Sequence, residues 1–212
     1  MRILIILAGH TMPSEFIHKI KKLAEYIEVL RQTYGVDIAC ISSFDDFTEY
    51  DNILHFKYKI VNPKKQLSKV CDFLSEIPND YSWYIKTRPD IEFMSPIDFS
   101  KLKTAHINAR VRVYKGPRKM KLAASIGRGS YAAWAGNISL GFVERMIMDD
   151  QVYIFSNSIK YIFTPFDYNP EIIENEWFHS HFWKSKNAQL NMISLDVVFS
   201  NSKVYVPSGN VN

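Results

Sequence analysis

Apolar and polar residues alternate in blocks along the first half of the chain, and the blocks predict strands and helices in turn. An apolar run at residues 2–8 is too short to cross a bilayer and predicts a buried strand. Between residues 14 and 35, apolar residues recur at helical spacing, which predicts a helix with one face on a sheet. That face consists of Phe16, Ile20, Leu23, Ile27 and Leu30. A second apolar run at 36–42 completes a βαβ unit, so the sequence predicts a parallel sheet.

The pattern continues with three further elements before residue 94. We expect a short strand at 53–58, a helix opened by Asn62-Pro63, and an aromatic strand over residues 81–93. The inner face of this helix would carry Leu67, Val70, Cys71 and Leu74. Two βα units before the 81–93 strand would place its end beside the end of the first strand.

The alternation is less regular after residue 93. We expect strands at 106–113, 152–156, 194–200 and 203–206, and helices ending at Asp149-Asp150 and spanning 171–184. The sequence therefore predicts one α/β domain over residues 1–206, with a central, mostly parallel mixed sheet flanked by helices. Residues 207–212 are expected to be a linker-like tail, with further domains following it.

Composition narrows the class of protein. The chain has 212 residues, of which 47% are hydrophobic, enough for one sizeable core. A formal charge of +4 permits an anionic ligand but does not indicate a nucleic-acid binder. Cys40 and Cys71 fall in apolar segments, which favours two buried thiols in a reducing compartment over a disulfide. We therefore expect a soluble, cytoplasmic protein with no stable membrane insertion.

The main candidate for chemistry is the end of the 81–93 strand. Side chains alternate along an extended chain, so Lys86, Arg88, Asp90 and Glu92 would share one side of it. Pro89 would end the strand. Two cations and two carboxylates suit a metal ion with an anionic ligand, although solvated charges at a strand end explain the pattern equally well.

Other phosphate-binding and hydrolytic motifs are missing from the sequence. No P-loop, no serine nucleophile elbow and no His-Glu-x-x-His pattern occurs, and Gly9 stands alone where a dinucleotide fingerprint needs several glycines. Two carboxylates one residue apart are hard oxygen ligands, which suit Mg²⁺ or Mn²⁺ carrying substrate phosphates.

Charged residues also gather in later segments of the chain, where they suggest roles beyond folding. Residues 110–128 include seven Lys or Arg and no acid, which indicates either a solvated basic hairpin or a flap over an anionic substrate. Asp149-Asp150 at the end of a helix would oppose its dipole, which suggests a role other than stability. The 171–184 helix carries Glu174, Glu176, His179 and His181.

The segment Tyr-Ile-Lys-Thr-Arg-Pro-Asp-Ile-Glu-Phe at residues 84–93 resembles the Asp-x-Asp motif of GT-A fold glycosyltransferases. The run from Asp149 to Phe155 is similar to the Asp-Gln strand of that family, and the run from Glu174 to His179 to its acid-bearing C-terminal helix. Over nearly its full length the chain also resembles the N-terminal glycosyltransferase domain encoded by a large chlorella virus. That resemblance implies a GT-A (Rossmann-like) fold and a role in synthesis of capsid glycans in the host cell cytoplasm.

The resemblance also implies roles for individual residues. Asp90 and Glu92 would hold Mn²⁺ or Mg²⁺, with Glu92 replacing the second Asp of the motif and lengthening its reach. Lys86 and Arg88 would face the phosphates of the donor or hold the carboxylates in place. The residues implied around uracil and ribose are Ala8, Gly9, His10, Ser42 and Ser43. The acids implied on the acceptor side are Asp149, Asp150, Glu174 and Glu176, one of which would act as general base in an inverting reaction.

Together these features predict a metal-dependent glycosyltransferase that moves a hexose or deoxyhexose from a UDP-sugar to a hydroxyl group of a glycan. Two alternatives remain. A sugar-phosphate nucleotidyltransferase shares the sheet and the metal, although such enzymes carry more glycines after the first strand than Gly9. A non-catalytic module would bind nucleic acid or glycan through the basic 110–128 segment.

Overall fold

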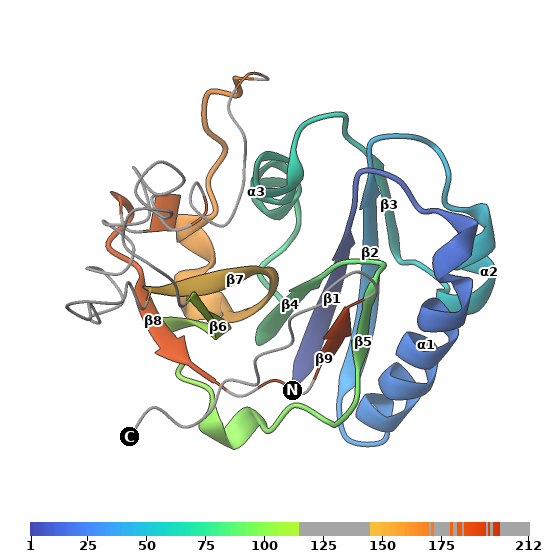
Figure 1. Cartoon of the computed structure of the whole chain (residues 1–212), viewed down its shortest axis with the longest axis horizontal. Helices are drawn as coiled ribbons and strands as arrows, with labels where there is room; N and C mark the ends of the chain where they lie inside the picture. Colours follow the sequence, from blue (N-terminus) through green and yellow to red (C-terminus); the bar gives the residue numbers. More distant parts are fainter. Residues whose placement is uncertain are drawn as a thin grey trace.

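The fold of the chain is given by a computed structural model, which describes residues 1–114, 145–169, 171, 179, 182, 183, 185–193, 195 and 197–199. Within these ranges the backbone alone is described at 110–114, 145–150, 192, 198 and 199. A seven-stranded sheet with the order β3-β2-β1-β4-β7-β6-β8 forms the centre (Figure 1). Its strands are β1 (Arg2–Ala8), β2 (Gly35–Ser42), β3 (Tyr58–Val61), β4 (Trp83–Thr87), β6 (His106–Tyr114), β7 (Arg145–Ser156) and β8 (Gln189–Met192).

Most neighbouring strands of this sheet run in the same direction. β1 pairs in parallel with both β2 and β4, and β2 pairs in parallel with β3. β7 runs antiparallel to β4 and β6, while β8 is parallel to β6. The sheet is therefore mixed and mostly parallel, which confirms the predicted α/β fold class.

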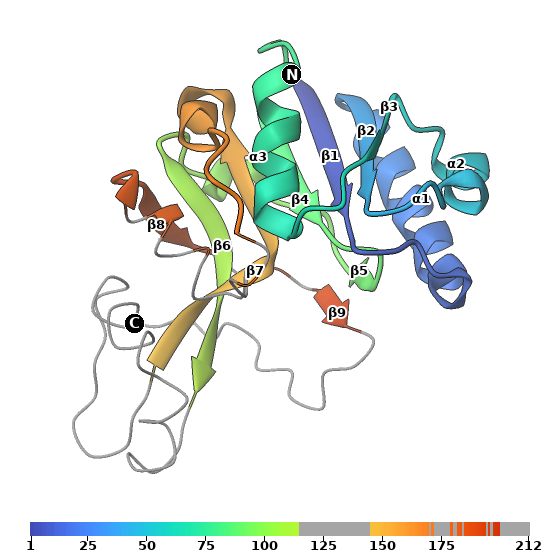
Figure 2. The ribbon, with the colours of Figure 1, turned by 90° about the horizontal axis from the view of Figure 1, so that it is seen from above.

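Helices cover both faces of the sheet. α1 (Ile17–Arg31) and α2 (Thr48–Leu54) lie on one face, and α3 (Gln66–Glu76) lies on the other (Figure 2). Short 3₁₀ helices occur at η1 (Ser14–Phe16), η2 (Phe99–Lys101) and η3 (Asn157–Ile162). No helix within the described ranges is both long enough and apolar enough to traverse a bilayer.

The central strand β1 explains why two helical layers are needed. Ile3, Ile5 and Leu7 pack in the core on the α1 side, and Leu4 and Ile6 pack in the core on the α3 side. A strand that is buried on both faces is an unbroken apolar run rather than an alternating one. Cys40 and Cys71 are buried free thiols in β2 and α3, as predicted, and burial raises the pKa of Cys40.

Two predicted elements have the wrong secondary structure. The segment expected to be a strand at 53–58 contains the end of α2, which closes where His55 takes a left-handed conformation with φ 54°. The Asp51 carboxylate then accepts a hydrogen bond from the backbone of Phe56, at 2.8 Å, and this bond directs the chain into β3.

The second error concerns Asp149-Asp150, which we expected at the end of a helix. Both residues lie inside strand β7, as does Met146. The reason is tertiary: β7 pairs with β4 on one side and β6 on the other, and this pairing overrides the helical spacing of its apolar residues. The start of that predicted helix, and the strand predicted at 203–206, lie outside the described residues.

The 81–93 segment is also not one strand. β4 ends at Thr87, and a hydrogen bond of 3.2 Å from the Ile91 amide to the Arg88 carbonyl closes a β-turn with Pro89 at its second position. The chain resumes as β5 (Ile91–Phe93), which pairs antiparallel with β9 (Val197–Phe199) in a separate two-stranded sheet. The four charged residues predicted to share one side of a single strand are therefore divided: Arg88 and Asp90 face each other, whereas Lys86 and Glu92 have other partners.

Truncation of a core side chain of β4 should test the two-sided burial of the sheet. Ile85 is fully buried on the α1 side, so Ile85→Ala is expected to lower the free energy of unfolding by about 2–5 kcal/mol. Val29 on α1 is 47% exposed, so Val29→Ala should change stability by no more than about 0.5 kcal/mol. Urea unfolding followed by circular dichroism measures the free energy of unfolding of both variants. Equal losses in Ile85→Ala and Val29→Ala would contradict this packing.

Candidate functional site

The parallel strands β2, β1 and β4 bring three loops to one edge of the sheet. The first two loops are joined by backbone hydrogen bonds. The Gly9 amide donates to the carbonyl of Ile41 at 3.1 Å, and the Ser43 amide donates to the carbonyl of His10 at 3.0 Å. Carboxyl ends of parallel strands are where open α/β sheets bind ligands, so this edge is the candidate site.

Two serines at the end of β2, Ser42 and Ser43, contact the loop that follows β1. Ser42 is fully buried, and its hydroxyl donates to the carbonyl of His10 at 3.3 Å. Ser43 is also buried, and its Oγ lies 3.0 Å from Nδ1 of His10. Ser42 and Ser43 therefore fix the position of His10 within the structure.

Helix α3 supplies two polar side chains to the same edge. Gln66 donates from Nε2 to the carbonyl of Ala8 at 3.1 Å. The ammonium of Lys69 is buried and donates to the carbonyl of Gly9 at 3.0 Å and to Oγ of Ser43 at 2.9 Å. Lys69 thus links the first loop to the second.

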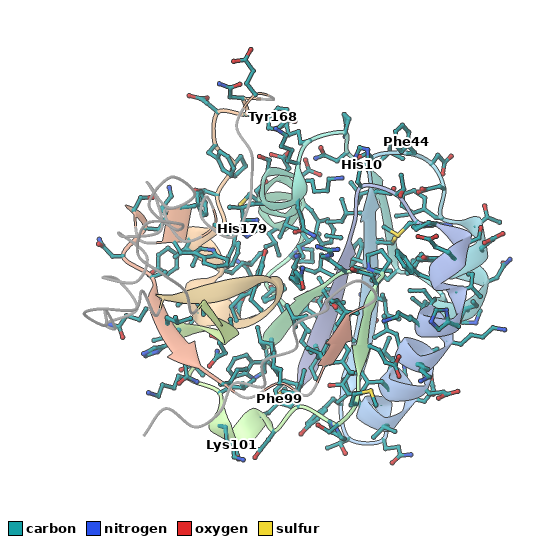
Figure 3. The ribbon with its side chains drawn as sticks, in the orientation of Figure 1. His10, Phe44, Phe99, Lys101, Tyr168 and His179 are labelled. Carbon is teal, nitrogen blue, oxygen red and sulfur yellow. The ribbon has the colours of Figure 1, made fainter. Side chains whose placement is uncertain are left out.

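Two aromatic rings are accessible at this edge. His10 is exposed, and Phe44 is 54% exposed in the loop after β2. Their ring centroids are 5.5 Å apart with an edge-to-face arrangement, and the two residues lie together at the top of Figure 3. Exposed rings at a strand end offer a surface on which a planar group can stack.

Gly9 brings the third loop into contact with the first. A Cβ atom on Gly9 would lie 2.9 Å from the carbonyl oxygen of Thr11 and 3.2 Å from Cγ of Pro89. Because so little space remains, the turn after β1 and the turn after β4 touch at this glycine. The site is therefore continuous from His10 to Pro89.

The turn after β4 holds a carboxylate bound by two hydrogen bonds to one guanidinium. Nε of Arg88 donates to Oδ1 of Asp90 at 2.8 Å, and Nη2 donates to Oδ2 at 2.7 Å. The side chain of Asp90 is only 9% exposed. Holding the carboxylates in place was one of the two roles expected of Arg88, and the structure shows this contact for Asp90.

Helix α1 holds the same turn with two lysines one helical turn apart. Nζ of Lys19 donates to the backbone carbonyl of Asp90 at 3.1 Å, and the ammonium of Lys22 forms an ion pair with the carboxylate of Glu92. Ring stacking of Tyr26 on Phe93, with centroids 4.8 Å apart, continues this contact along α1. The turn and β5 are thus fixed to the helix, and both carboxylates have a cationic partner.

Asp90 and Glu92 are the two carboxylates predicted to hold a metal ion, and each is paired with a cationic side chain. Both oxygens of Asp90 accept hydrogen bonds from Arg88, so a divalent cation would have to take the place of the guanidinium there. Mg²⁺ and related ions commonly use one or two carboxylates together with substrate phosphates. Glu92 faces Lys22 instead, and the described residues contain no group of three or more His, Cys, Asp or Glu that could hold a metal ion.

Lys86 lies inside the core instead of at the surface of the site. It is fully buried, and its Nζ donates to the backbone carbonyl of Gln151 at 3.2 Å and lies 5.3 Å from the centroid of the Tyr153 ring. His179, labelled in Figure 3, is also fully buried, and its ring packs edge-on against the rings of Tyr153 and Trp183. A role for Lys86 at phosphates stays a prediction.

The acids expected on the acceptor side are placed only in part. β7 pairs through Tyr153 with Ala109 and through Met148 with Val111, so the stretch between them, which contains Asp149 and Asp150, is irregular. Its backbone lies near the end of β4, because the next residue, Gln151, accepts the hydrogen bond from Lys86. Glu174 and Glu176 lie outside the described residues, as does most of the basic 110–128 segment.

Of the site residues predicted from the sequence, the structure brings Gly9, His10, Ser43, Arg88 and Asp90 to one edge. The sequence analysis did not point to Lys19, Lys22, Gln66 and Lys69, whose contacts hold the loops at this edge. Lys19 and Lys69 sit among apolar positions of α1 and α3, and a lysine on the inner face of a helix is the signal that could have drawn attention to them.

Known structures share this fold. No family model matches the sequence, and no curated protein sequence matches it. Among solved structures, the 4-diphosphocytidyl-2C-methyl-D-erythritol synthase of Anaerococcus prevotii matches with a TM-score of 0.58 and 10% identity, over 96% of this chain and 89% of that one. The CMP:2-keto-3-deoxy-manno-octonic acid synthetase in complex with CTP matches with a TM-score of 0.52 and 11% identity, over 91% and 88%.

A glycosyltransferase is also similar. The Drosophila β-1,4-galactosyltransferase 7, in complex with manganese, UDP-Gal and xylobiose, matches with a TM-score of 0.51 and 6% identity, over 95% of this chain and 66% of that one. At these identities the similarity establishes the fold, which nucleotidyltransferases and GT-A-like glycosyltransferases share. It has no bearing on a viral origin.

The close approach at Gly9 can be tested by one added methyl group. Gly9→Ala is expected to destabilise the protein by about 1–3 kcal/mol, because the new Cβ meets backbone at Thr11 and the ring of Pro89. Gly35→Ala is the matched control, since its Cβ would lie 3.4 Å from the flexible side chain of Arg2, with an expected change within about 1 kcal/mol. Thermal unfolding measures the stability of both variants. Equal stability of Gly9→Ala and Gly35→Ala would show that the loops after β1 and β4 are not in contact.

The buried His179 predicts a pH dependence of stability. Burial, and then the charge of Lys86, holds the pKa of His179 well below its ordinary value in the folded protein. In the unfolded chain the ordinary value of about 6.5 applies, so below that pH only the unfolded state binds the proton. Stability should therefore fall with decreasing pH, by up to about 1.4 kcal/mol per pH unit from this group.

His179→Phe should flatten this slope between about pH 7 and about pH 5, since the variant has no group to protonate there. Exposed Val29 on α1 provides the control, since Val29→Ala changes no ionisable group and should keep the wild-type slope. Urea unfolding at a series of pH values measures the slope. An unchanged slope in His179→Phe would mean that His179 takes up a proton in the folded protein.

Proposed function

We propose that the chain is a glycosyltransferase that moves a hexose or deoxyhexose from a nucleotide sugar, UDP-linked, to a hydroxyl group of a glycan. The observation that carries this proposal is the continuity of the edge. Exposed rings at the ends of β1 and β2 adjoin, through Gly9 and Pro89, a turn that carries Arg88 and Asp90. Such an edge has an aromatic part for a base and a charged part for a diphosphate.

Each part of the edge suits one part of the donor. His10 and Phe44 present rings on which uracil can stack, and Ser42 and Ser43 hold His10 in place. Lys69 adds positive charge at the same loops, which favours an anionic ligand over a neutral one. Arg88 has the planar fork that binds phosphate oxygens in pairs, so the diphosphate would lie over the turn after β4.

The reaction breaks the bond between the anomeric carbon and the diphosphate oxygen and forms a bond from that carbon to the acceptor oxygen. A divalent cation, Mn²⁺ or Mg²⁺, would neutralise the charge on the departing diphosphate when bound at Asp90. Arg88 would add to that neutralisation. In an inverting reaction the acceptor proton would pass to a carboxylate of the acceptor side, which we assign to Asp149, Asp150 or Glu176.

The sequence resemblance alone supports the wider setting of the proposal. On that resemblance we propose that the reaction belongs to the synthesis of viral capsid glycans in the cytoplasm of the host cell.

A sugar-phosphate nucleotidyltransferase is the second candidate, and the structural similarities favour it. The two synthases match with TM-scores of 0.58 and 0.52 over 89% and 88% of their own chains, against 0.51 over 66% for the galactosyltransferase. Against it stands Gly9, the single glycine in the turn after β1. Release of pyrophosphate from a nucleoside triphosphate and a sugar phosphate would establish this activity.

Nucleotide titrations test the proposed function. Calorimetry with UDP, GDP and CMP, each with and without Mn²⁺, is expected to show preference for UDP and a requirement for the metal. Asp90→Asn should weaken metal-dependent UDP binding by about tenfold or more, because it removes the charge of the proposed ligand. Metal-independent binding, or absence of a preference for UDP, would argue against the proposal.

Asp98→Asn is the control for that substitution. Asp98 precedes Phe99 and Lys101, which lie at the opposite end of the molecule from His10 and Phe44 (Figure 3). The Asp98→Asn variant should therefore bind UDP and Mn²⁺ with the same affinity as the wild-type protein. Equal losses in Asp90→Asn and Asp98→Asn would show that the effect does not arise at the candidate site.

A further inference from the structure

We propose that Arg88 is the resident counter-cation of Asp90, and that a divalent cation and the Arg88 guanidinium compete for the same two carboxylate oxygens. When a divalent cation binds the carboxylate of Asp90, the guanidinium of Arg88 is released and can bind the diphosphate of the donor. The competition follows from the geometry of the turn after β4. The second step, transfer of Arg88 to phosphate, rests on the proposed function.

The hydrogen bonds show why both cations cannot bind Asp90 at once. Nε and Nη2 of Arg88 each use one oxygen, at 2.8 and 2.7 Å, so the pair is bidentate. The side chain of Asp90 is only 9% exposed, which leaves little room for a second cation beside its carboxylate. A metal that coordinates these oxygens must therefore displace the guanidinium or share one oxygen with it.

The two partners differ in how firmly the rest of the structure holds them. Asp90 is held by the amide-to-carbonyl bond that closes its turn and by Lys19, which donates to its backbone carbonyl at 3.1 Å. Arg88 has a side chain that is 34% exposed, and the guanidinium bonds recorded for it within the described residues both go to Asp90. Arg88 is therefore the partner that can move away, while Asp90 keeps its position.

Charge around the turn makes the exchange dependent on the anionic ligand. Three cations, Lys19, Lys22 and Arg88, contact a turn with two carboxylates, Asp90 and Glu92. A further divalent cation raises that excess of positive charge, whereas a diphosphate that binds the released Arg88 reduces it. Metal and diphosphate should therefore each strengthen binding of the other, and by equal factors, as linkage requires.

Removal of the guanidinium tests the competition with the metal alone. Arg88→Gln is expected to bind Mn²⁺ about tenfold more tightly than the wild-type protein without nucleotide, because a charge-assisted bond to Asp90 no longer has to be broken. Free Mn²⁺ is measured by electron paramagnetic resonance during titration of the full chain. Arg88→Lys keeps the charge but cannot form two parallel bonds, so its affinity should fall between the two, and it carries the test if Arg88→Gln does not fold.

Two further variants separate this exchange from a general effect of charge. Arg31→Gln removes one positive charge from an exposed ion pair with Glu28 on α1, and its Mn²⁺ affinity should stay within about twofold of wild type. Lys22→Gln frees Glu92 instead of Asp90. If Lys22→Gln strengthens Mn²⁺ binding and Arg88→Gln does not, Glu92 is the metal ligand and the proposal is overturned.

Nucleotide titrations then distinguish failure of this inference from failure of the proposed function. In the wild-type protein UDP should strengthen Mn²⁺ binding, and in Arg88→Gln this coupling should be smaller by about tenfold. Tighter Mn²⁺ binding by Arg88→Gln without UDP binding by any variant would keep the exchange and refute the nucleotide-sugar function. Unchanged Mn²⁺ binding in Arg88→Gln overturns the exchange, whether or not UDP binds.

Discussion

The parallel pairing of β1 with β2 on one side and with β4 on the other is the constraint on which the site depends. It places the carboxyl ends of three strands in register, from Ala8 beside Ile41 to Leu7 beside Thr87. β1 can occupy that central position because both of its faces are apolar and each is covered by a helical layer. The loops that follow these strands therefore start from fixed points.

Charge in the site is compensated by side chains that belong to the protein. Arg88 pairs with Asp90, Lys22 pairs with Glu92, and Lys19 and Lys69 donate to backbone carbonyls at the edge. Partly buried carboxylates need such partners, because an unpaired buried charge is strongly destabilising. A ligand that binds these side chains would have to separate groups already bound to one another, so its affinity would depend on how easily each pair separates.

The sequence was sufficient where local pattern decides structure. β1, β2, α1 and α3 follow from apolar spacing, and the fold class follows from their order. It was insufficient at β7 and at the 53–58 segment, where strand pairing and a left-handed residue at His55 decide. Asp90 was predicted from its type and position, and Arg88 was expected to hold the carboxylates in place. The β-turn across which this contact forms was not predicted, because an extended strand also places residues two apart on the same side.

Pro89 joins these levels of the structure at one position. Its ring provides the fixed φ that suits the second position of the turn, so β4 must end at Thr87. The turn brings Arg88 and Asp90 to the same side, where their side chains bind. Its ring also contacts Gly9, which ties the charged turn to the loop that carries His10. In the sequence, Pro89 predicts only the end of a strand. In the structure, it also brings Arg88 and Asp90 together and holds their turn against the loop that carries His10.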